Sequence, residues 1–326
     1  MTHPDPDLTS AADLALADGL TGPAASGGQP PVPGTTRFRG TFGELWLDGE
    51  DFLTHDFREH GWYEPDGVAL CVRVGLALQR VEGPFVTLDV GANVGFFAVP
   101  LARTFEGPLV AFEPNPVARR LLAANLSLND LAARVDIRAV ALGRQAGEVR
   151  LSLPPVYEGR PNLGATWVDP AGAGEPVPLA PLDALGLGSV RLVKMDVEGF
   201  EHEVLLGGRA LLRSEQPVLY LELIDAHLRR AGSSARAVLD LLADLGYAFW
   251  RHEANVLAVP AMRRALLADV TRGLWPVSRH RFVERPNAVR AVRRARRVVA
   301  LADEAARHLV ANTSTGLLAA LRHHFA

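Results

Sequence analysis

Residues 85–97 read FVTLDVGANVGFF, the most informative segment of the chain. Its first six residues are nearly all apolar or β-branched, which is typical of a strand buried on both faces of a sheet. Gly91 and Gly95 then predict a tight turn in which the backbone can approach a ligand closely. The apolar residues after the turn predict a helix that packs on the strand. A strand, a glycine turn and a helix in this order indicate a ligand with polar groups above the turn.

The alternation of strand and helix continues along the chain. Further strands are expected at residues 108–113, 135–140, 190–196 and 218–223, and helices at residues 116–128, 201–212 and 235–245. Residues 247–251 and 255–259 predict an antiparallel pair that closes the sheet. Alternating strands and helices imply right-handed crossovers, so the predicted fold class is α/β, with a doubly wound, mostly parallel sheet.

Composition divides the chain into four parts. Residues 1–35 are rich in Pro, Gly, Ala and Ser, which predicts a disordered tail. Residues 36–84 form an N-terminal cap section, with the aromatic residues 62–63 expected in its core. The predicted sheet occupies residues 85–260, and a helical appendage follows at residues 261–326. Apolar faces on these last helices make them a candidate surface for a homodimer.

Composition also limits the classes of function. Of the 326 residues, 48% are hydrophobic and 22% are charged, as in an ordinary globular protein. The net charge of −3 argues against a protein that binds nucleic acid over a broad face. Cys71 is the only cysteine, which excludes a disulfide framework and a thiolate metal cluster. The sequence shows no basic leader and no apolar run of bilayer length, so the expected setting is the cytoplasm.

The residues around the turn indicate which ligand it binds. The GANVG spacing at residues 91–95 departs from the G-x-G-x-x-G pattern that places a pyrophosphate. Asp89 would repel phosphates and suits a ligand with an amino group. Glu113, at the end of the next strand, can accept hydrogen bonds from both hydroxyls of a ribose. S-adenosylmethionine combines a ribose, a cation and no phosphate, while NAD and a purely structural turn are the alternatives.

Four motifs in order then carry a family resemblance. DVGANVG (89–95), FEPNP (112–116), VKMDVEGFEHEVLLGG (193–208) and VLYLEL (218–223) resemble the FkbM-type family of S-adenosylmethionine-dependent methyltransferases. The resemblance implies a class I methyltransferase (Rossmann-like) fold and O-methylation of a hydroxyl on a sugar, glycolipid or secondary metabolite. The donor-binding residues that it implies are Asp89, Gly91, Asn93, Gly95, Glu113 and Asn115, and Ala141 and Asp196 are further donor-binding candidates. The partner would be a small-molecule or glycan acceptor.

A second cluster of charged residues surrounds the strand at 190–196. Lys194 is the only lysine among the 34 basic Lys and Arg residues, and it shares a strand face with Asp196. A charged pair inside a buried parallel strand is costly without a functional reason. The candidate catalytic residues are Lys194, Asp196, Glu198 and Glu222. Asp196 or Glu222 would act as the base, and Lys194 would orient the acceptor oxygen.

Other interpretations of the same residues stay open. Asp196, Glu198 and Glu222 offer three oxygen ligands that would suit Mg²⁺, although no metal ligand is assigned. Residues 157–175 form a Gly- and Pro-rich loop that either covers the acceptor or lies on the surface. The rival functions are a non-catalytic module that binds S-adenosylmethionine or a partner, and an NAD-dependent dehydrogenase.

Overall fold

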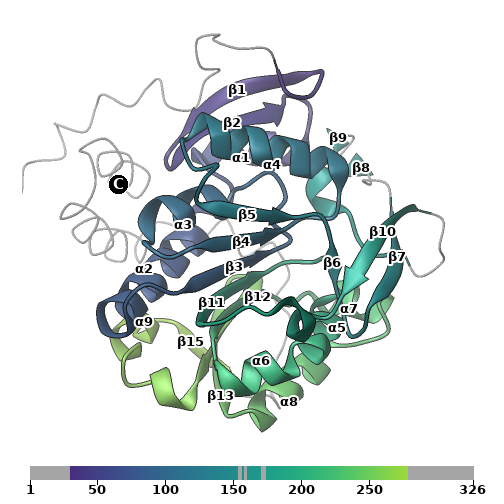
Figure 1. The fold of residues 1–326 in the computed structure, drawn as a ribbon. Helices are drawn as coiled ribbons and strands as arrows, with labels where there is room; N and C mark the ends of the chain where they lie inside the picture. The colour runs from purple at the N-terminus through teal and green to yellow at the C-terminus, as the bar shows by residue number, and fades with distance from the viewer. Residues whose placement is uncertain (1–29, 153–155, 158–159, 170–173, 278–326) are drawn as a thin grey trace, which may run out of the picture.

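The computed structural model describes residues 30–152, 156–157, 160–169 and 174–277, and Figure 1 shows how its elements are arranged. Residues 1–29 of the expected N-terminal tail lie outside the described residues. Most of the expected C-terminal appendage, and with it the candidate surface for a homodimer, also lies outside them. Within the described part, none of the helices combines the length and the hydrophobicity that crossing a bilayer requires.

An eight-stranded sheet forms the centre of the molecule (Figure 1). In spatial order its strands are β15 (Trp275–Val277), β13 (Tyr247–His252), β14 (Asn255–Pro260), β12 (Val218–Glu222), β11 (Val190–Met195), β3 (Val86–Val90), β4 (Leu109–Phe112) and β5 (Val135–Arg138). The strands from β12 to β5 are parallel, whereas β14, β13 and β15 pair antiparallel. The chain steps outward from β3 to β4 and β5, and later returns to β11 on the other side of β3. The predicted doubly wound, mostly parallel sheet is confirmed, and its strand order reverses between β3 and β11.

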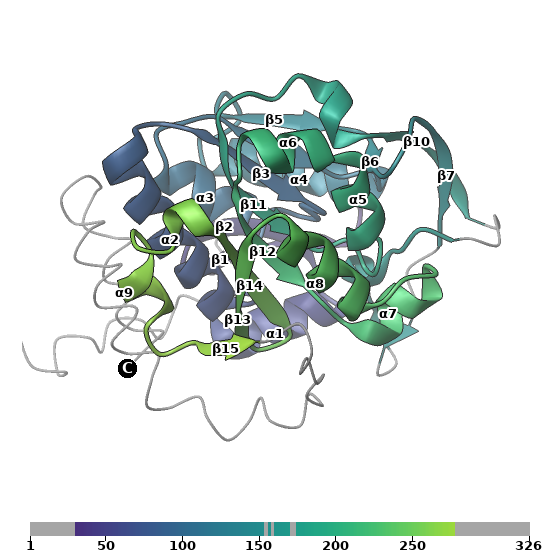
Figure 2. The ribbon, with the colours of Figure 1, turned by 90° about the horizontal axis from the view of Figure 1, so that it is seen from below.

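The central strands carry apolar side chains on both faces because helices cover both. Leu109 and Ala111 of β4 belong to one core, while Val110 and Phe112, which alternate with them, belong to the other. The first core includes residues of α2 (Pro65–Glu82), α3 (Ala98–Thr104) and α4 (Pro116–Leu128). The helices of the second are α5 (Glu201–Gly207), α6 (Arg209–Ser214), α7 (Asp225–Arg230) and α8 (Ala235–Asp244), and Figure 2 shows them together. The result is a three-layer α/β/α arrangement.

The N-terminal section packs onto the first of these cores. Strands β1 (Thr35–Gly40) and β2 (Gly43–Asp48) form a hairpin, and α1 (Phe52–His60) follows it. Trp62, just after α1, is fully buried and donates a hydrogen bond from Nε1 to the carbonyl oxygen of Phe96 at 2.8 Å. The section therefore shares its core with the sheet.

A smaller sheet lies at the right of Figure 1, beside the carboxyl ends of the parallel strands. In spatial order it contains β6 (Ala141–Leu142), β10 (Glu175–Ala180) and β7 (Gly147–Leu151). The short pair β8 (Val156–Tyr157) and β9 (Arg160–Pro161) precedes a 3-10 turn at Leu163–Ala165. Ala141, Leu142, Leu151 and Leu163 from this part of the chain line a cavity at this edge of the large sheet.

Two segments differ from the sequence-based prediction. The helix predicted over residues 201–212 is divided into α5 and α6, because Gly208 leaves the helical conformation with φ −115° and ψ 19°. The described part of the predicted helical appendage is only partly helical. It contains a 3-10 turn at Ala261–Arg263, the short helix α9 (Ala268–Thr271) and strand β15, in which Trp275 pairs with Arg251. The sheet therefore extends beyond residue 260.

Asn125 connects the N-terminal hairpin to the sheet, and its removal tests that connection. Its buried side chain accepts a hydrogen bond from the N–H of Trp46 at 2.6 Å and donates one to the carbonyl oxygen of Val94 at 2.8 Å. Asn125→Ala leaves both groups unpaired, so the free energy of unfolding should fall by about 1–3 kcal/mol for each. Urea denaturation measures this loss, with Ser127→Ala on the exposed side of α4 as the control. Equal stabilities for the two variants would contradict the prediction.

Candidate functional site

The turn between β3 and α3 has an unusual backbone conformation. Gly91 and Gly95 have positive φ angles of 77° and 103°, and Asn93 between them has a φ of 50°. A Cβ atom at position 91 would lie 1.8 Å from the carbonyl oxygen of Asp196. Only glycine fits at this position, because the end of β11 packs directly against the turn. The two strands at the reversal of strand order therefore meet without an intervening side chain.

Lys194 lies beneath this turn with 6% of its surface exposed. Its Nζ donates a hydrogen bond to the carbonyl oxygen of Gly91 at 2.9 Å. The same atom lies 3.5 Å from Oδ1 of Asp89, 3.7 Å from Oδ2 of Asp196 and 5.0 Å from the ring centroid of Phe97. Burial alone would lower the pKa of Lys194, but the charges of Asp89 and Asp196 raise it above its ordinary value. The ammonium group therefore stays charged.

Asp89 does not face the cavity in the way that the sequence analysis expects. Its side chain is fully buried, and the register of β3 against β11 places it directly beside Lys194. Burial raises the pKa of Asp89 to about 6, although the charge of Lys194 opposes the shift. The geometry therefore gives Asp89 an indirect place in the site, through Lys194, rather than direct contact with the amino group of a ligand.

Glu113 follows β4 and connects two turns at the edge of the sheet. Its Oε2 accepts a hydrogen bond from the N–H of Asn93 at 2.7 Å, and its Oε1 accepts one from the N–H of Asn115 at 2.8 Å. Asn115 in turn caps α4, where its Oδ1 accepts from the N–H of Val117 at 2.9 Å. Burial raises the pKa of Glu113 to about 7, although the two N–H donors oppose the shift. Each carboxylate oxygen can accept a second hydrogen bond, so both can still bind a ligand.

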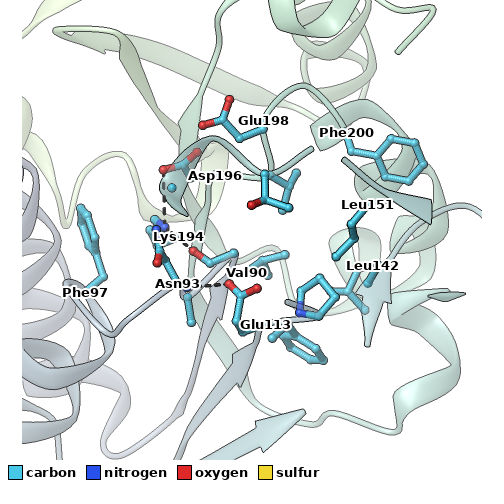
Figure 3. Close-up of a pocket in the computed structure, with 18 of the residues that line it drawn as sticks. Val90, Asn93, Phe97, Glu113, Leu142, Leu151, Lys194, Asp196, Glu198 and Phe200 are labelled. Carbon is cyan, nitrogen blue, oxygen red and sulfur yellow. Dashed lines mark hydrogen bonds and ion pairs between the residues drawn. The ribbon is translucent and has the colours of Figure 1, made fainter. Parts of the chain in front are cut away.

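A cavity lies over these residues, with about 870 Å³ of empty space when its open mouth is included (Figure 3). The polar residues of its wall are Asn93, Glu113, Thr166, Lys194, Asp196 and Glu198, and its apolar residues include Phe112, Val140, Leu142, Leu151 and Phe200. Figure 3 shows Phe97 and Lys194 on one side, and Leu142, Leu151 and Phe200 on the opposite side. The cavity therefore combines an apolar surface with a group of carboxylates.

Residues 162–169 close one side of the cavity. Leu163, Gly164, Thr166 and Val168 line it. The segment is held by a hydrogen bond from the N–H of Leu163 to Oδ2 of Asp51 at 2.8 Å, and by one from Nδ2 of Asn115 to Oγ1 of Thr166 at 3.3 Å. The central part of the loop predicted at residues 157–175, which the structure describes, therefore lines the cavity.

Glu201 shapes the segment that carries Asp196 and Glu198. Its side chain is 1% exposed, and its Oε1 accepts hydrogen bonds from the N–H of Val197 at 3.0 Å and of Gly199 at 3.3 Å. Burial raises the pKa of Glu201 to about 7. Glu201 is not among the site residues predicted from the sequence, because a carboxylate at a helix start is usually only a favourable charge. The structure adds a second contribution, since this carboxylate fixes the backbone of the turn after β11.

His227, which is not among the site residues predicted from the sequence, joins two of the predicted carboxylates. Its Nδ1 lies 3.0 Å from Oε2 of Glu198 and 3.8 Å from Oε2 of Glu222. These carboxylates raise the pKa of His227 to about 10, while burial raises the pKa values of Glu198 and Glu222. The available signal is weak: His227 follows a strand end by five residues, and a lone histidine has no periodic pattern.

The structure brings most of the predicted site residues to one cavity. Gly91, Asn93, Glu113, Ala141, Lys194, Asp196 and Glu198 line it, whereas Asp89, Gly95, Asn115 and Glu222 lie behind its wall in the described structure. Tyr63, which the sequence analysis expects in the core, also lines the cavity, with its ring centroid 5.2 Å from that of Phe96. Its neighbour Trp62 is fully buried, and the sequence offers no signal that separates the two aromatic residues.

Similarity to a known family begins in β3 and ends in β13. Residues 89–249 match the model of the family described as the methyltransferase FkbM domain. The chain is 32% identical to methyltransferase sdnD of Sordaria araneosa over 158 residues, which cover 39% of this chain and 61% of that protein. It is 29% identical to methyltransferase 1 of Beauveria bassiana over 144 residues, which cover 37% of this chain and 57% of that protein. The chain thus spans less than two thirds of the length of either relative.

Among solved structures, the chain is similar to a methyltransferase FkbM from Methylobacillus flagellatus KT, with a TM-score of 0.38 and 16% sequence identity. The matched region covers 64% of this chain and 62% of that chain.

The contacts of Glu201 predict a loss of stability when its carboxylate is removed. In Glu201→Ala the N–H groups of Val197 and Gly199 lose their acceptor, at a cost of about 1–3 kcal/mol for each group that stays buried. Glu203→Ala on the same helix is the control, because the carboxylate of Glu203 forms a surface ion pair with Arg144. Chemical denaturation and amide hydrogen exchange at residues 197 and 199 measure the effect. Unchanged exchange rates at both amides would rule out this contribution of Glu201.

Proposed function

Because residues 89–249 belong to the FkbM methyltransferase family, we propose that this chain is an S-adenosylmethionine-dependent methyltransferase that acts on a hydroxyl group. The sheet has the class I methyltransferase (Rossmann-like) fold that the sequence motifs imply. One observation carries the proposal: a single cavity at the reversal of strand order contains Glu113 from one strand end and Lys194 and Asp196 from another. In open α/β sheets, ligands bind at this position.

The cavity fits the chemical parts of the proposed donor. Phe112, Val140 and Leu142 provide an apolar surface that suits a flat purine ring. Both oxygens of Glu113 can accept a further hydrogen bond, which suits the two hydroxyls of a ribose. The carboxylate of Asp196 suits a cationic end. These residues would hold the donor, and the glycine turn would let it approach the backbone closely.

The acceptor needs a base beside the donor. When bound, S-adenosylmethionine supplies a methyl group whose carbon–sulfur bond breaks, with its electron pair left on sulfur, as the acceptor oxygen bonds to the carbon. The protein must hold that oxygen in line and remove its proton. Asp196 and Glu198 are the carboxylates in the cavity wall that can accept this proton. Lys194 stays protonated, so it orients Asp196 from 3.7 Å instead of acting as the base.

The proposed acceptor is a hydroxyl of a sugar, a glycolipid or a secondary metabolite. Burial raises the pKa of Glu198, which makes its carboxylate a stronger base than an exposed glutamate. A screen of these acceptor classes with isotopically labelled donor, read by mass spectrometry, tests the proposal. Donor binding without transfer to any acceptor would favour the alternative of a non-catalytic binding module. Binding of NAD in place of S-adenosylmethionine would favour a dehydrogenase.

The pKa of Glu113 predicts how donor affinity depends on pH. Since burial raises this pKa to about 7, the carboxyl group gains a proton as the pH falls through 7 and can then accept fewer hydrogen bonds. The affinity for S-adenosylhomocysteine should fall with pH below that point, by up to about tenfold per pH unit. In Glu113→Gln this dependence should be missing. Isothermal titration calorimetry measures both proteins, and parallel pH profiles would remove Glu113 from the ribose site.

Lys194 and Asp196 allow catalysis to be separated from folding. The ammonium group of Lys194 is compact and fits between two carboxylates and a carbonyl oxygen. The guanidinium group of arginine is larger and planar, so it cannot make the same contacts. Lys194→Arg should therefore fold and bind the donor but lose most methyl transfer. Asp196→Asn should lose about 10²–10⁴-fold if Asp196 is the base. Turnover is measured beside thermal unfolding of the same preparations. Loss of stability with normal turnover per folded molecule would make the pair purely structural.

A further inference from the structure

Three side chains from separate elements converge beside the cavity. Glu198 follows β11, Glu222 ends β12 and His227 lies in α7. One ligand atom of each, a ring nitrogen or a carboxylate oxygen, lies within 4.8 Å of the other two. From this convergence we propose that His227, Glu198 and Glu222 form a binding site for a divalent transition-metal cation.

The separations within the cluster match those around a metal ion. Nitrogen and carboxylate oxygen ligands lie ~2.0–2.2 Å from such an ion, so two ligands of one ion are ~2.8–4.4 Å apart. The distances from Nδ1 of His227 to Oε2 of Glu198 and of Glu222, 3.0 and 3.8 Å, fall within this range. Side-chain exposures of 29% for His227, 17% for Glu198 and 14% for Glu222 leave room for entry from solvent.

The charges around the cluster favour a bound cation. Asp196 adds the negative charge of a third carboxylate, which acts on both Glu198 and Glu222. The neighbouring cations are engaged with other groups. Lys194 contacts Asp89, Asp196 and the carbonyl oxygen of Gly91.

Arg230 is a second cation near the cluster. It donates to the carbonyl oxygen of Glu198 at 2.9 Å, and its guanidinium carbon lies 4.3 Å from the ring centroid of Trp167. A proton on His227 offsets only one of the three carboxylate charges. A divalent ion in place of that proton would offset two of the three charges.

The ligand types indicate which cation the site would prefer. Mg²⁺ favours oxygen ligands, whereas an imidazole nitrogen suits Fe²⁺, Ni²⁺, Cu²⁺ and Zn²⁺, and carboxylates also suit Mn²⁺. One imidazole and two carboxylates therefore favour a first-row transition metal. This set differs from the three oxygen ligands considered in the sequence analysis, because Asp196 is directed toward Lys194 and His227 takes its place.

The position of the cluster indicates that the cation activates the acceptor, and this step rests on the proposed methyltransferase function. Glu198 lines the cavity, so an ion bound to it would lie at the cavity edge, within reach of an acceptor. A metal ion lowers the pKa of a hydroxyl bound to it, which eases removal of the proton. The site would then select acceptors that offer two neighbouring oxygen atoms, such as a vicinal diol or a hydroxyl beside a carbonyl.

Binding of Mn²⁺ alone to the full-length protein tests the site directly. After treatment with a chelator and removal of the chelator, the protein is titrated with Mn²⁺ and free ion is followed by electron paramagnetic resonance. We expect one ion per chain in the wild type. His227→Gln and Glu222→Gln should each weaken binding by about tenfold or more, since even outer-shell partners of metal ligands contribute 10–100-fold. Glu203→Gln removes a carboxylate of α5 that is paired with Arg144, and this variant should bind Mn²⁺ like the wild type.

The outcomes separate this proposal from the proposed function. Absence of Mn²⁺ binding in the wild type, or equal binding in all three variants, would overturn the metal site and leave a histidine–carboxylate ion pair. Thermal unfolding of each preparation shows whether a variant is folded, and the wild-type titration decides the question if a variant is not. Calorimetry with S-adenosylhomocysteine in the same variants should give wild-type affinity. Mn²⁺ binding without donor binding would retain the metal site and overturn the proposed function.

Discussion

The buried ammonium group of Lys194 joins the two strands on which the cavity is built. Lys194 and Asp89 are register partners in β11 and β3, and the lysine also contacts Asp196 and the carbonyl oxygen of Gly91. A lone ammonium group at this depth would be strongly destabilising, and the two carboxylates offset that cost. The charge pair therefore fixes the turn after β3 and the end of β11 relative to each other.

The remaining strand ends are joined to this point by bonds from side chains to the backbone. Glu113 after β4 accepts from the N–H groups of Asn93 and Asn115, and Glu201 accepts from those of Val197 and Gly199. The groups proposed to bind the donor and remove the proton thus lie on three adjacent strand ends, β4, β3 and β11. Such preorganisation matters for methyl transfer, because the acceptor oxygen and methyl carbon must be held in line.

Local patterns predicted the elements, but contacts between distant segments had to come from the structure. The strands could be predicted because helices cover both faces, so their sequences are nearly continuous apolar runs. Glu113 and Asp196 were placed correctly at strand ends because the carboxyl ends of parallel strands share one edge. The register that buries Asp89 beside Lys194 leaves no trace in either strand alone. Residues 162–169 are held at the cavity by a hydrogen bond from Leu163 to Asp51, 112 residues away in the sequence. Strand β15 is only three residues long, which is too short for a recognisable pattern.

The acidic character of the cavity affects how strongly the donor is held before and after methyl transfer. Burial raises the pKa values of Glu113 and Glu198, so an empty cavity holds these groups less fully ionised than they would be in water. A ligand with a positively charged sulfur favours the ionised form of Glu198, and the same ligand without its methyl group is neutral at sulfur. The electrostatic attraction between the cavity and the sulfur therefore weakens after transfer, which favours release of the spent donor. Glu113 is independent of this change, since its proposed hydrogen bonds are to a ribose that both forms of the donor contain.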